Sequence, residues 1–368
     1  MLVCTQCERE YGDLEPVWRC SCGGTLRLEG YGLPEDASGR GIWRWLRGLP
    51  IGGDKIVSLG EGETPLIEKK VGDAEAWFKL DYLQPSGSYK DRGMSVLVSW
   101  LRAAGPGQII EDSSGNAGSS MAAYCAAGGL SCDVYVPDYT SEGKCVQVRA
   151  YGARLVRVPG SREDTTRVAV GAGAGSSGRS FYASHNWSPW FLQGIKTWFL
   201  EVFEALPGVR NLVVPVGQGS IALGARLAME DLRRAGRLKA LPRMFAVQPA
   251  LCAPLAQAFD AGLDEPALIE KGETAAEGIA SAEPVRGAEV LRGVRETDGG
   301  FVTVEEDEIW ASLRDLCRAG LYVEPTSAAA AAGWRKLLSS GRVGAREQTV
   351  VYLSGIGLKA TDKIAGHS

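Results

Sequence analysis

The chain has 368 residues, of which 45% are hydrophobic and 23% are charged. This is enough for two or three domains with buried cores. A net charge of -4 argues against a nucleic-acid partner. No apolar run approaches the roughly 20 residues of a membrane span, and the N-terminus lacks the apolar stretch of a signal peptide. The composition therefore predicts a cytoplasmic protein with no membrane partner.

The first 30 residues carry a cluster of cysteines and form a predicted separate module. Four thiolates in two close pairs suit a tetrahedral structural zinc site, and a module this short needs a metal to fold. The second pair is C-x-C rather than C-x-x-C, so a metal-free relic or a redox pair are the alternatives. The predicted zinc ligands are Cys4, Cys7, Cys20 and Cys22. The other five of the nine cysteines stand singly among apolar residues and are predicted to be buried thiols.

A lysine follows the turn between the apolar strand predicted at 76–80 and the helix predicted at 91–104. Pro85 and Gly87 mark the turn, and Lys90 comes directly before the predicted helix. A lysine held at such a junction can be desolvated, which makes its amine a nucleophile for carbonyl groups. The alternative is a surface lysine that pairs with Asp91.

After Lys90, strand and helix signals alternate, which predicts mostly parallel sheets covered by helices. The predicted strands are 108–112, 132–136, 153–158, 181–184, 211–216, 243–248 and 347–353. The predicted helices are 91–104, 116–128, 141–151, 161–175, 189–206, 220–235, 305–319 and 325–339.

Three further motifs follow apolar strands: Ser113-Ser114-Gly115-Asn116-Ala117-Gly118, Gly217-Gln218-Gly219-Ser220-Ile221 and Ser354-Gly355-Ile356-Gly357-Leu358-Lys359. With the turn Pro85-Ser86-Gly87-Ser88-Tyr89-Lys90-Asp91-Arg92-Gly93, they stand in the same order as in the fold-type II pyridoxal phosphate (PLP) enzymes, the tryptophan synthase β family. The chain resembles this family from Gly60 to Lys359, and within it the lysine turn is most similar to that of the threonine synthases. The glycine turn after an apolar strand also suits a phosphate on physical grounds, because its backbone N–H groups lie at a helix N-terminus.

The resemblance implies a fold and a domain division. It predicts two three-layer α/β/α domains with mostly parallel sheets, in addition to the N-terminal zinc ribbon. The large PLP-binding domain comprises 31–95 and 190–368, and a small mobile domain comprises 96–189. We expect a homodimer.

The resemblance also implies a role for each motif. Lys90 would form the Schiff base with PLP and move protons, and Asn116 would bond to the ring oxygen O3′. Ser354 would face the pyridine nitrogen, where a hydroxyl favours elimination and replacement over transamination. The phosphate cradle would be Gly217, Gln218, Gly219, Ser220 and Ile221. An amino-acid substrate would be held by Ser113, Ser114, Gly115, Ala117 and Lys196.

The sequence departs from threonine synthases at a position where they carry arginine and this chain has Phe191. A charged contact to the phosphate of O-phosphohomoserine is therefore missing. The strip 276–280 and Ser354 are closer to serine/threonine dehydratases. The leading interpretation is a threonine synthase-like enzyme that acts on an activated homoserine or serine derivative. The alternatives are an α,β-eliminating ammonia-lyase, a β-replacement synthase of the cysteine synthase type, and a catalytically silent binding protein. His185 is predicted to be structural.

Overall fold

The computed structural model describes residues 1–173 and 180–367. Contacts divide the chain into two compact units, Met1–Gly62 with Lys90–Ile195, and Glu63–Tyr89 with Lys196–Ser368. Residues 31–62 thus group with the first unit, whereas the sequence places them in the large domain. The catalytic domain boundaries drawn from the sequence stay a prediction.

The first unit contains two sheets. A small antiparallel sheet has the order β2-β1-β3 and lies in the cysteine-rich module. A parallel sheet of four strands has the order β8-β7-β6-β9. The strands are β1 (Leu2–Cys4), β2 (Glu10–Tyr11), β3 (Leu26–Leu28), β6 (Gln108–Glu111), β7 (Ser131–Pro137), β8 (Arg154–Val158) and β9 (Ser180–Tyr182).

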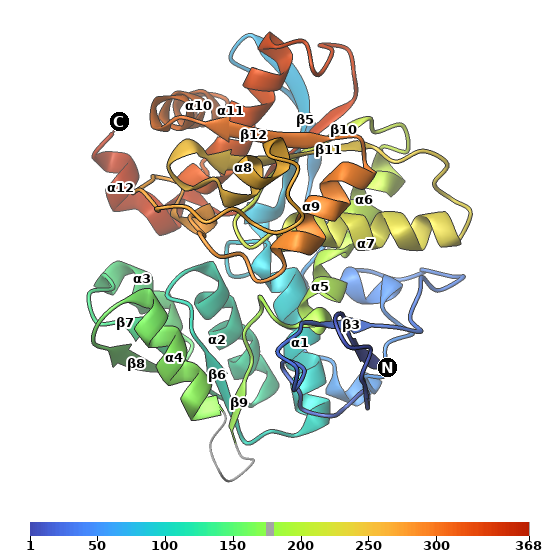
Figure 1. Cartoon of the computed structure of the whole chain (residues 1–368), viewed down its shortest axis with the longest axis vertical. Coiled ribbons are helices and arrows are strands. Elements are labelled where there is room, and N and C mark those ends of the chain that lie inside the picture. The colour runs from blue at the N-terminus through green and yellow to red at the C-terminus, as the bar shows by residue number, and fades with distance from the viewer. Residues whose placement is uncertain (174–179, 368) are drawn as a thin grey trace. The chain divides into compact units, whose positions relative to one another are not determined.

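Helices cover the parallel sheet of the first unit and pack against one another (Figure 1). Three of them, α2, α3 and α4, contact its strands, and α1 packs against α2 and α5. The helices are α1 (Lys90–Ala104), α2 (Asn116–Gly128), α3 (Glu142–Ala150), α4 (Arg162–Gly173) and α5 (Pro189–Ile195). The last two residues of the helix predicted at 161–175 lie outside the described residues.

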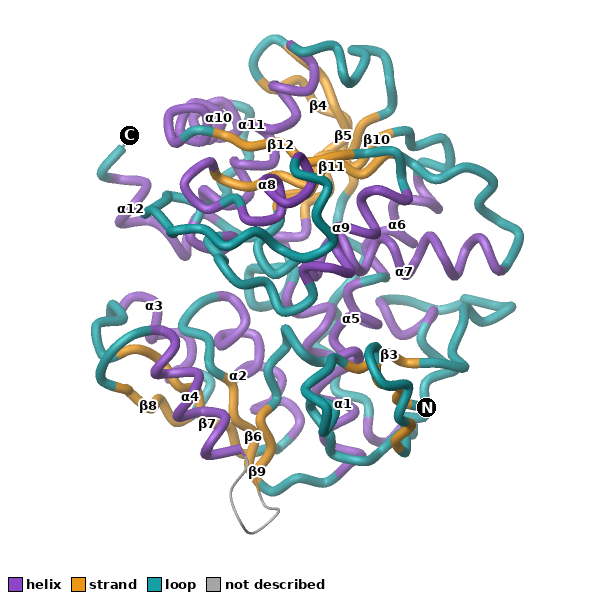
Figure 2. Tube along the Cα trace, viewed as in Figure 1, coloured by secondary structure: helices purple, strands orange, loops and turns teal. Residues whose placement is uncertain are grey.

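The second unit is built on a six-stranded sheet of order β12-β11-β10-β13-β5-β4 (Figure 2). All neighbouring strands are parallel except β4 and β5, which are antiparallel. The buried run of β10 suits the centre of such a sheet, because parallel strands are covered on both faces. The strands are β4 (Leu66–Val71), β5 (Ala74–Leu80), β10 (Asn211–Pro215), β11 (Arg243–Pro249), β12 (Gly300–Val304) and β13 (Thr349–Leu353).

Two of the longer helices of the second unit, α10 and α11, carry clear sequence signals at their starts. A capping box of Glu305 and Glu308 begins α10, and Pro325 begins α11. The helices are α6 (Thr197–Ala205), α7 (Ser220–Arg234), α8 (Pro254–Asp260), α9 (Gly287–Glu296), α10 (Glu306–Arg318), α11 (Pro325–Ser339) and α12 (Thr361–Ala365).

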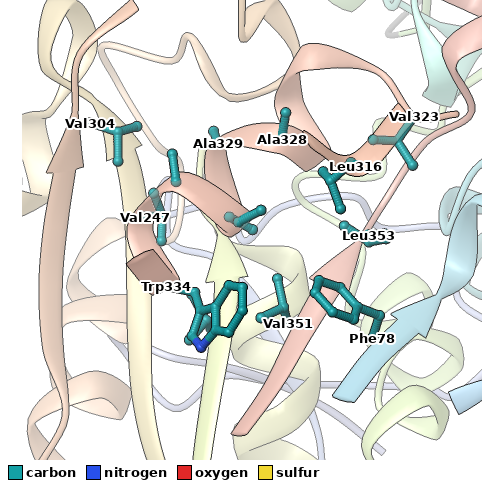
Figure 3. Close-up of a cluster of buried hydrophobic side chains, with 14 of the residues drawn as sticks. Phe78, Val247, Val304, Leu316, Val323, Ala328, Ala329, Trp334, Val351 and Leu353 are labelled. Carbon is teal, nitrogen blue, oxygen red and sulfur yellow. The ribbon is translucent and has the colours of Figure 1, made fainter. Parts of the chain in front are cut away.

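The core of the second unit forms where α11 lies on the sheet (Figure 3). Trp334 of α11 meets the ring of Phe78 from β5 edge-on, with 5.8 Å between ring centroids. The small side chains of the alanine run 328–332 are buried here, so the helix comes close to the strands. At Gly333, an added Cβ would lie 2.5 Å from Cγ2 of Val247 on β11. The alanine-rich segment is therefore a packing surface, as its helical pattern predicts.

The predicted fold class is confirmed, but the helix predicted at 189–206 is wrong as a single element. The structure has α5 and α6 there, separated at Lys196. The N–H of Phe199 donates to the carbonyl of Lys196, a bond of three-residue spacing that interrupts the regular α-helical ladder. The strands and α-helices without a predicted counterpart are β1, β2, β3, β4, β12, α8, α9 and α12.

Among the described residues, no helix combines the length and apolarity needed to cross a bilayer.

We predict that Gly333→Val lowers the thermal-unfolding midpoint, because the new side chain would overpack the core against Val247. Overpacking of this kind costs about 1–3 kcal/mol. The matched control is Gly171→Val, at an exposed position of α4 where an added Cβ meets nothing within 4 Å. Calorimetry of both variants checks this, and equal midpoints would contradict the packing described for α11.

Candidate active site

The lysine turn is held by backbone bonds within the second unit. The N–H of Tyr89 donates to the carbonyl of Ser354 at 2.9 Å, and the N–H of Ile356 donates to the carbonyl of Gly87 at 3.0 Å. Gly87 has φ +86°, and a Cβ there would lie 2.8 Å from Cγ2 of Ile356. The turn therefore requires glycine at this position. Helix α1 begins at Lys90, the residue directly after the hydrogen-bonded segment Gly87–Tyr89.

The turn also contains a buried hydroxyl that fits a polar ligand. Ser88 is fully buried, and its Oγ has no hydrogen-bond partner among the described residues. Buried polar atoms in native proteins are nearly always bonded to protein, water or a ligand.

The predicted phosphate cradle lies at the N-terminus of α7, a helix of 15 residues. Gly219 has φ +87°, and no described side chain caps the helix. A Cβ on Gly217 would lie 2.7 Å from the Cα of Ile279, within the strip 276–280. The first N–H groups of a helix have no intrahelical acceptor, so this end suits a phosphate. The residues present therefore fit the phosphate group of PLP.

Two side chains of the cradle have protein partners. Gln218 donates through Nε2 to Ser281 Oγ at 2.7 Å and accepts the N–H of Val285 at 2.9 Å. Ser220 Oγ lies 2.9 Å from the hydroxyl of Tyr89. Gln218 can therefore serve a phosphate only through its backbone, and Tyr89 links the cradle to the lysine turn. Sequence reasoning did not single out Tyr89.

Ser354 is buried beside a second serine that sequence reasoning also missed. Ser327 Oγ accepts the N–H groups of Ser354 at 2.9 Å and of Gly355 at 3.0 Å. Its single proton then has two acceptors, Ser354 Oγ at 3.2 Å and the carbonyl of Gly355 at 3.3 Å. If Ser327 donates to Ser354, the proton of Ser354 is left to donate to a ring nitrogen. The signal in the sequence was a serine two residues after the helix-starting Pro325.

In the first unit, the predicted carboxylate loop lies at the N-terminus of α2. Gly115 occupies the N-cap position without a side-chain cap, so Asn116 is the first helical residue and not the cap. A Cβ on Gly118 would lie 1.9 Å from the carbonyl oxygen of Ser113, so the loop can adopt this conformation only with glycine at position 118. Ser114 and Ala117 lie on either side of this helix start. Such an end suits an anion as small as a carboxylate.

Lys90 lies at the start of α1 in the first unit, beside an aromatic ring. Its Nζ is 5.5 Å from the ring centroid of Phe191 on α5. Phe191 is fully buried, and it fits because Gly93 has no side chain: a Cβ there would lie 2.3 Å from the ring. The ring of Phe191 also lies 5.3 Å from that of His185, edge-on. The residue that replaces the expected arginine thus contacts both Lys90 and His185.

A buried carboxyl completes this part of the first unit. Glu111 ends β6, and its Oε1 lies 3.3 Å from Nδ1 of His185. Burial raises the pKa of the Glu111 carboxyl to about 7, against the opposing charges of Arg162 and Lys90. Burial lowers the pKa of His185 well below its usual value, and the charge of Lys90 lowers it further. His185 is therefore neutral near pH 7 and buried, in agreement with a structural histidine.

Lys196, predicted to bind substrate, is buried in the second unit and has a carboxylate partner. Its Nζ lies 2.8 Å from Oδ2 of Asp231 on α7. In the first unit, the exposed Arg149 of α3 pairs with Glu142. These ion pairs satisfy both cations within the protein.

The four N-terminal cysteines converge in the first unit. Their sulfur atoms all lie within 4.8 Å of one another, with 3.5 Å from Cys4 to Cys22 and 3.5 Å from Cys7 to Cys20. A disulfide would need about 2 Å, whereas tetrahedral zinc with Zn–S of about 2.3 Å places sulfur atoms about 3.8 Å apart. A Cβ on Gly24 would lie 2.9 Å from the sulfur of Cys4, so the knuckle requires glycine. This donor set can hold a tetrahedral thiophilic metal.

Comparisons with known proteins agree with this geometry. Residues 57–355 match the family model described as pyridoxal-phosphate dependent enzyme. A threonine synthase of Methanocaldococcus jannaschii is 31% identical over 98% of this chain and 93% of its own. One from Mycobacterium leprae is 32% identical over 85% of this chain and 87% of its own.

Solved structures with the same fold include the processed form of threonine deaminase isoform 2 from Solanum lycopersicum. It has a TM-score of 0.72 at 19% identity and covers 93% of each chain. O-ureido-L-serine synthase has a TM-score of 0.66 at 22% identity and covers 84% of this chain and 94% of its own. The chain therefore belongs to the family of pyridoxal-phosphate-dependent enzymes. Within that family it is threonine synthase-like.

Proposed function

We propose that this enzyme binds an amino-acid substrate and carries out PLP-dependent elimination or replacement on it, with an activated homoserine or serine derivative as the substrate class. The observation that carries the proposal is the 31% identity to a threonine synthase along 98% of the chain. The uncapped α7 N-terminus and the buried Ser354 support it, because they suit the phosphate and a ring nitrogen of PLP.

Each predicted residue has a role in this proposal. PLP, when bound, supplies an electron sink that weakens the bonds at the α-carbon of an amino acid. Lys90 holds the cofactor's aldehyde carbon and, once released, moves a proton at its Nζ. Asn116 bonds to O3′, and Ser354 donates to the ring nitrogen. The phosphate is held by the loop Gly217-Gln218-Gly219-Ser220-Ile221, chiefly through backbone N–H groups.

The substrate's α-carboxylate is held by the loop of Ser113, Ser114, Gly115 and Ala117. The N-terminus of α2 favours an anion there. Lys196, also predicted to bind substrate, is paired with Asp231, and this ion pair fixes the start of α6 against α7.

A second candidate is an α,β-eliminating enzyme whose substrate carries no phosphate. Phe191 favours it, because a fully buried ring occupies the position where threonine synthases have an arginine. The same observation favours a β-replacement enzyme that acts on a neutral serine ester. The prediction of a homodimer in the cytoplasm and the division into a small and a large catalytic domain complete the proposal.

We predict that PLP is attached to Lys90. The purified protein should show a visible absorbance band, and borohydride followed by peptide mass spectrometry should place the reduced label on Lys90. Lys90→Ala should lose the band, whereas Lys336→Ala, which removes an ion pair with Glu308, should keep it. A label on another lysine would contradict the assignment.

We predict weak use of O-phosphohomoserine relative to a threonine synthase that has the arginine. Losing a charged contact commonly costs about 1.5–3 kcal/mol, or on the order of 10- to 100-fold in kcat/KM. The measurement is a panel of O-phosphohomoserine, serine, threonine, O-phosphoserine and O-acetylserine, with amino-acid and keto-acid products followed separately.

Phe191→Arg and Phe191→Leu form the matched pair for this prediction. Only the arginine should raise kcat/KM for O-phosphohomoserine. Efficient turnover of that substrate by the wild type would show that Phe191 does not mark altered specificity. Rapid release of ammonia and keto acid from serine or threonine would instead identify a dehydratase.

We also propose that Cys4, Cys7, Cys20 and Cys22 bind one structural zinc ion. The convergence of the four sulfur atoms supports this. Elemental analysis should give about one zinc per chain. Cys22→Ser should lose the zinc and keep the PLP band, whereas Cys317→Ser on α10 should keep both. Protein purified without chelator that contains no metal would refute the proposal.

A further inference from the structure

A buried acid lies at the edge of the first unit's parallel sheet where ligands of α/β proteins bind. Glu111 is the last residue of β6, and His185 follows β9, the parallel neighbour of β6. Both therefore lie at the carboxyl ends of their strands, the edge at which such sheets bind ligands. The loop that leads to Asn116 begins directly after Glu111. Neither residue has a role in the function proposed above.

The two oxygens of the Glu111 carboxyl have different environments. Oε1 lies 3.3 Å from Nδ1 of His185, and it accepts a hydrogen bond from that nitrogen when the neutral ring carries its proton on Nδ1. Oε2 is buried and has no hydrogen-bond partner among the described residues. A carboxyl that only stabilised the fold would be expected to have both oxygens bonded. The orphaned Oε2 instead leaves one position for a proton.

Glu111 is also close enough to Lys90 for their charges to interact, and the charge of Lys90 acts on His185 as well. Phe191 contacts both Lys90 and His185, so one apolar ring packs against both groups. Low dielectric strengthens such an interaction and favours transfer of a proton over a separated ion pair. The titratable groups that interact with Glu111 from the surrounding elements are Lys90, Asp112, Cys132, Arg162, Tyr182 and His185.

We propose that Glu111 is a second acid–base group of this enzyme, which exchanges a proton with the amine of Lys90, and that His185 is the residue that positions it. This inference rests on the proposed role of Lys90. The Lys90 ammonium loses one proton and becomes a neutral amine, while Oε2 of Glu111 gains that proton and becomes the O–H of a carboxylic acid. No electrons are transferred and no other reactant is needed. The neutral amine of Lys90 can then act as the base. Glu111 keeps the proton until it returns it to that amine.

The test is the pH profile of kcat for the substrate that the panel identifies, measured with the holoenzyme. Glu111 must be ionised to accept the proton, so the wild-type rate should fall as the pH drops below about 7. Glu111→Gln should remove this acid limb and lower the maximal kcat on the order of 100-fold. Glu111→Asp should restore part of the rate together with an acid limb. An unchanged acid limb in Glu111→Gln would overturn the proposal.

The positioning role of His185 has its own pair of variants. His185→Leu removes the donor to Oε1, which destabilises the carboxylate and should move the acid limb to higher pH. His185→Asn offers an N–H in its place and should leave the limb closer to that of the wild type. Equal profiles for the two variants would refute the role of His185.

A readout without turnover separates this inference from the proposed function. Infrared difference spectra of the full-length protein should show a carboxylic-acid C=O band that titrates near pH 7 and is absent in Glu111→Gln. Asp133→Asn on the neighbouring strand β7 removes another buried carboxylate, which is paired with Arg154, and should change neither the band nor the pH profile. If PLP labels Lys90 but Glu111→Gln behaves as wild type, only this inference fails. If Lys90 is not labelled, the proposed function fails as well.

Discussion

The backbone pairing of the lysine turn with the segment after β13 is the constraint on which the rest of the second unit's site depends. Two reciprocal bonds, from Tyr89 to Ser354 and from Ile356 to Gly87, tie a turn near residue 87 to a loop near residue 355. The pairing works only with glycine at 87, where φ is positive and the packing leaves no room for Cβ. The pairing fixes the backbone of Tyr89, the residue before Lys90, and at the same time the backbone of Ser354, the serine predicted to face a ring nitrogen. Ser327 then holds that serine's backbone from α11.

In the first unit, a comparable constraint acts on side chains. The missing Cβ of Gly93 admits the ring of Phe191, and that ring contacts Lys90 and His185. His185 in turn approaches Glu111 across two neighbouring strands. An apolar residue at position 191 thus does two things: it removes a cation that a phosphate would need, and its ring packs against His185. The proposed change in substrate and the proposed proton transfer by Glu111 therefore both depend on Phe191.

The sequence predicted the parts of the site that depend on backbone geometry. Gly217, Gly219 and Gly118 occupy places where a Cβ would collide with backbone or side chain, and such positions leave a glycine pattern that can be read directly. The cysteine cluster could be read for a similar reason, because metal ligands must come in closely spaced pairs. The alternation of strands and helices along the sequence was sufficient to predict the mostly parallel sheets covered by helices.

The rest depended on contacts between residues distant in sequence. Glu111 and His185 are 74 positions apart, and Lys196 and Asp231 are 35 apart. No local pattern joins such pairs, so Lys196 was predicted to bind substrate although its amine is paired with Asp231. Strand β4 was missed because Glu68, Lys69 and Lys70 interrupt its apolar pattern, which is typical of an edge strand. The signal for Glu111 was present but weak: two acidic residues, Glu111 and Asp112, stand together at the end of a buried strand of a parallel sheet.

The most direct test of the central claim is a crystal structure of the protein grown with PLP. The account predicts continuous density from Nζ of Lys90 to the cofactor, the phosphate against the backbone N–H groups of 217–221, and the hydroxyl of Ser354 within hydrogen-bond distance of the ring nitrogen. PLP bound elsewhere, or a phosphate held away from the N-terminus of α7, would contradict it.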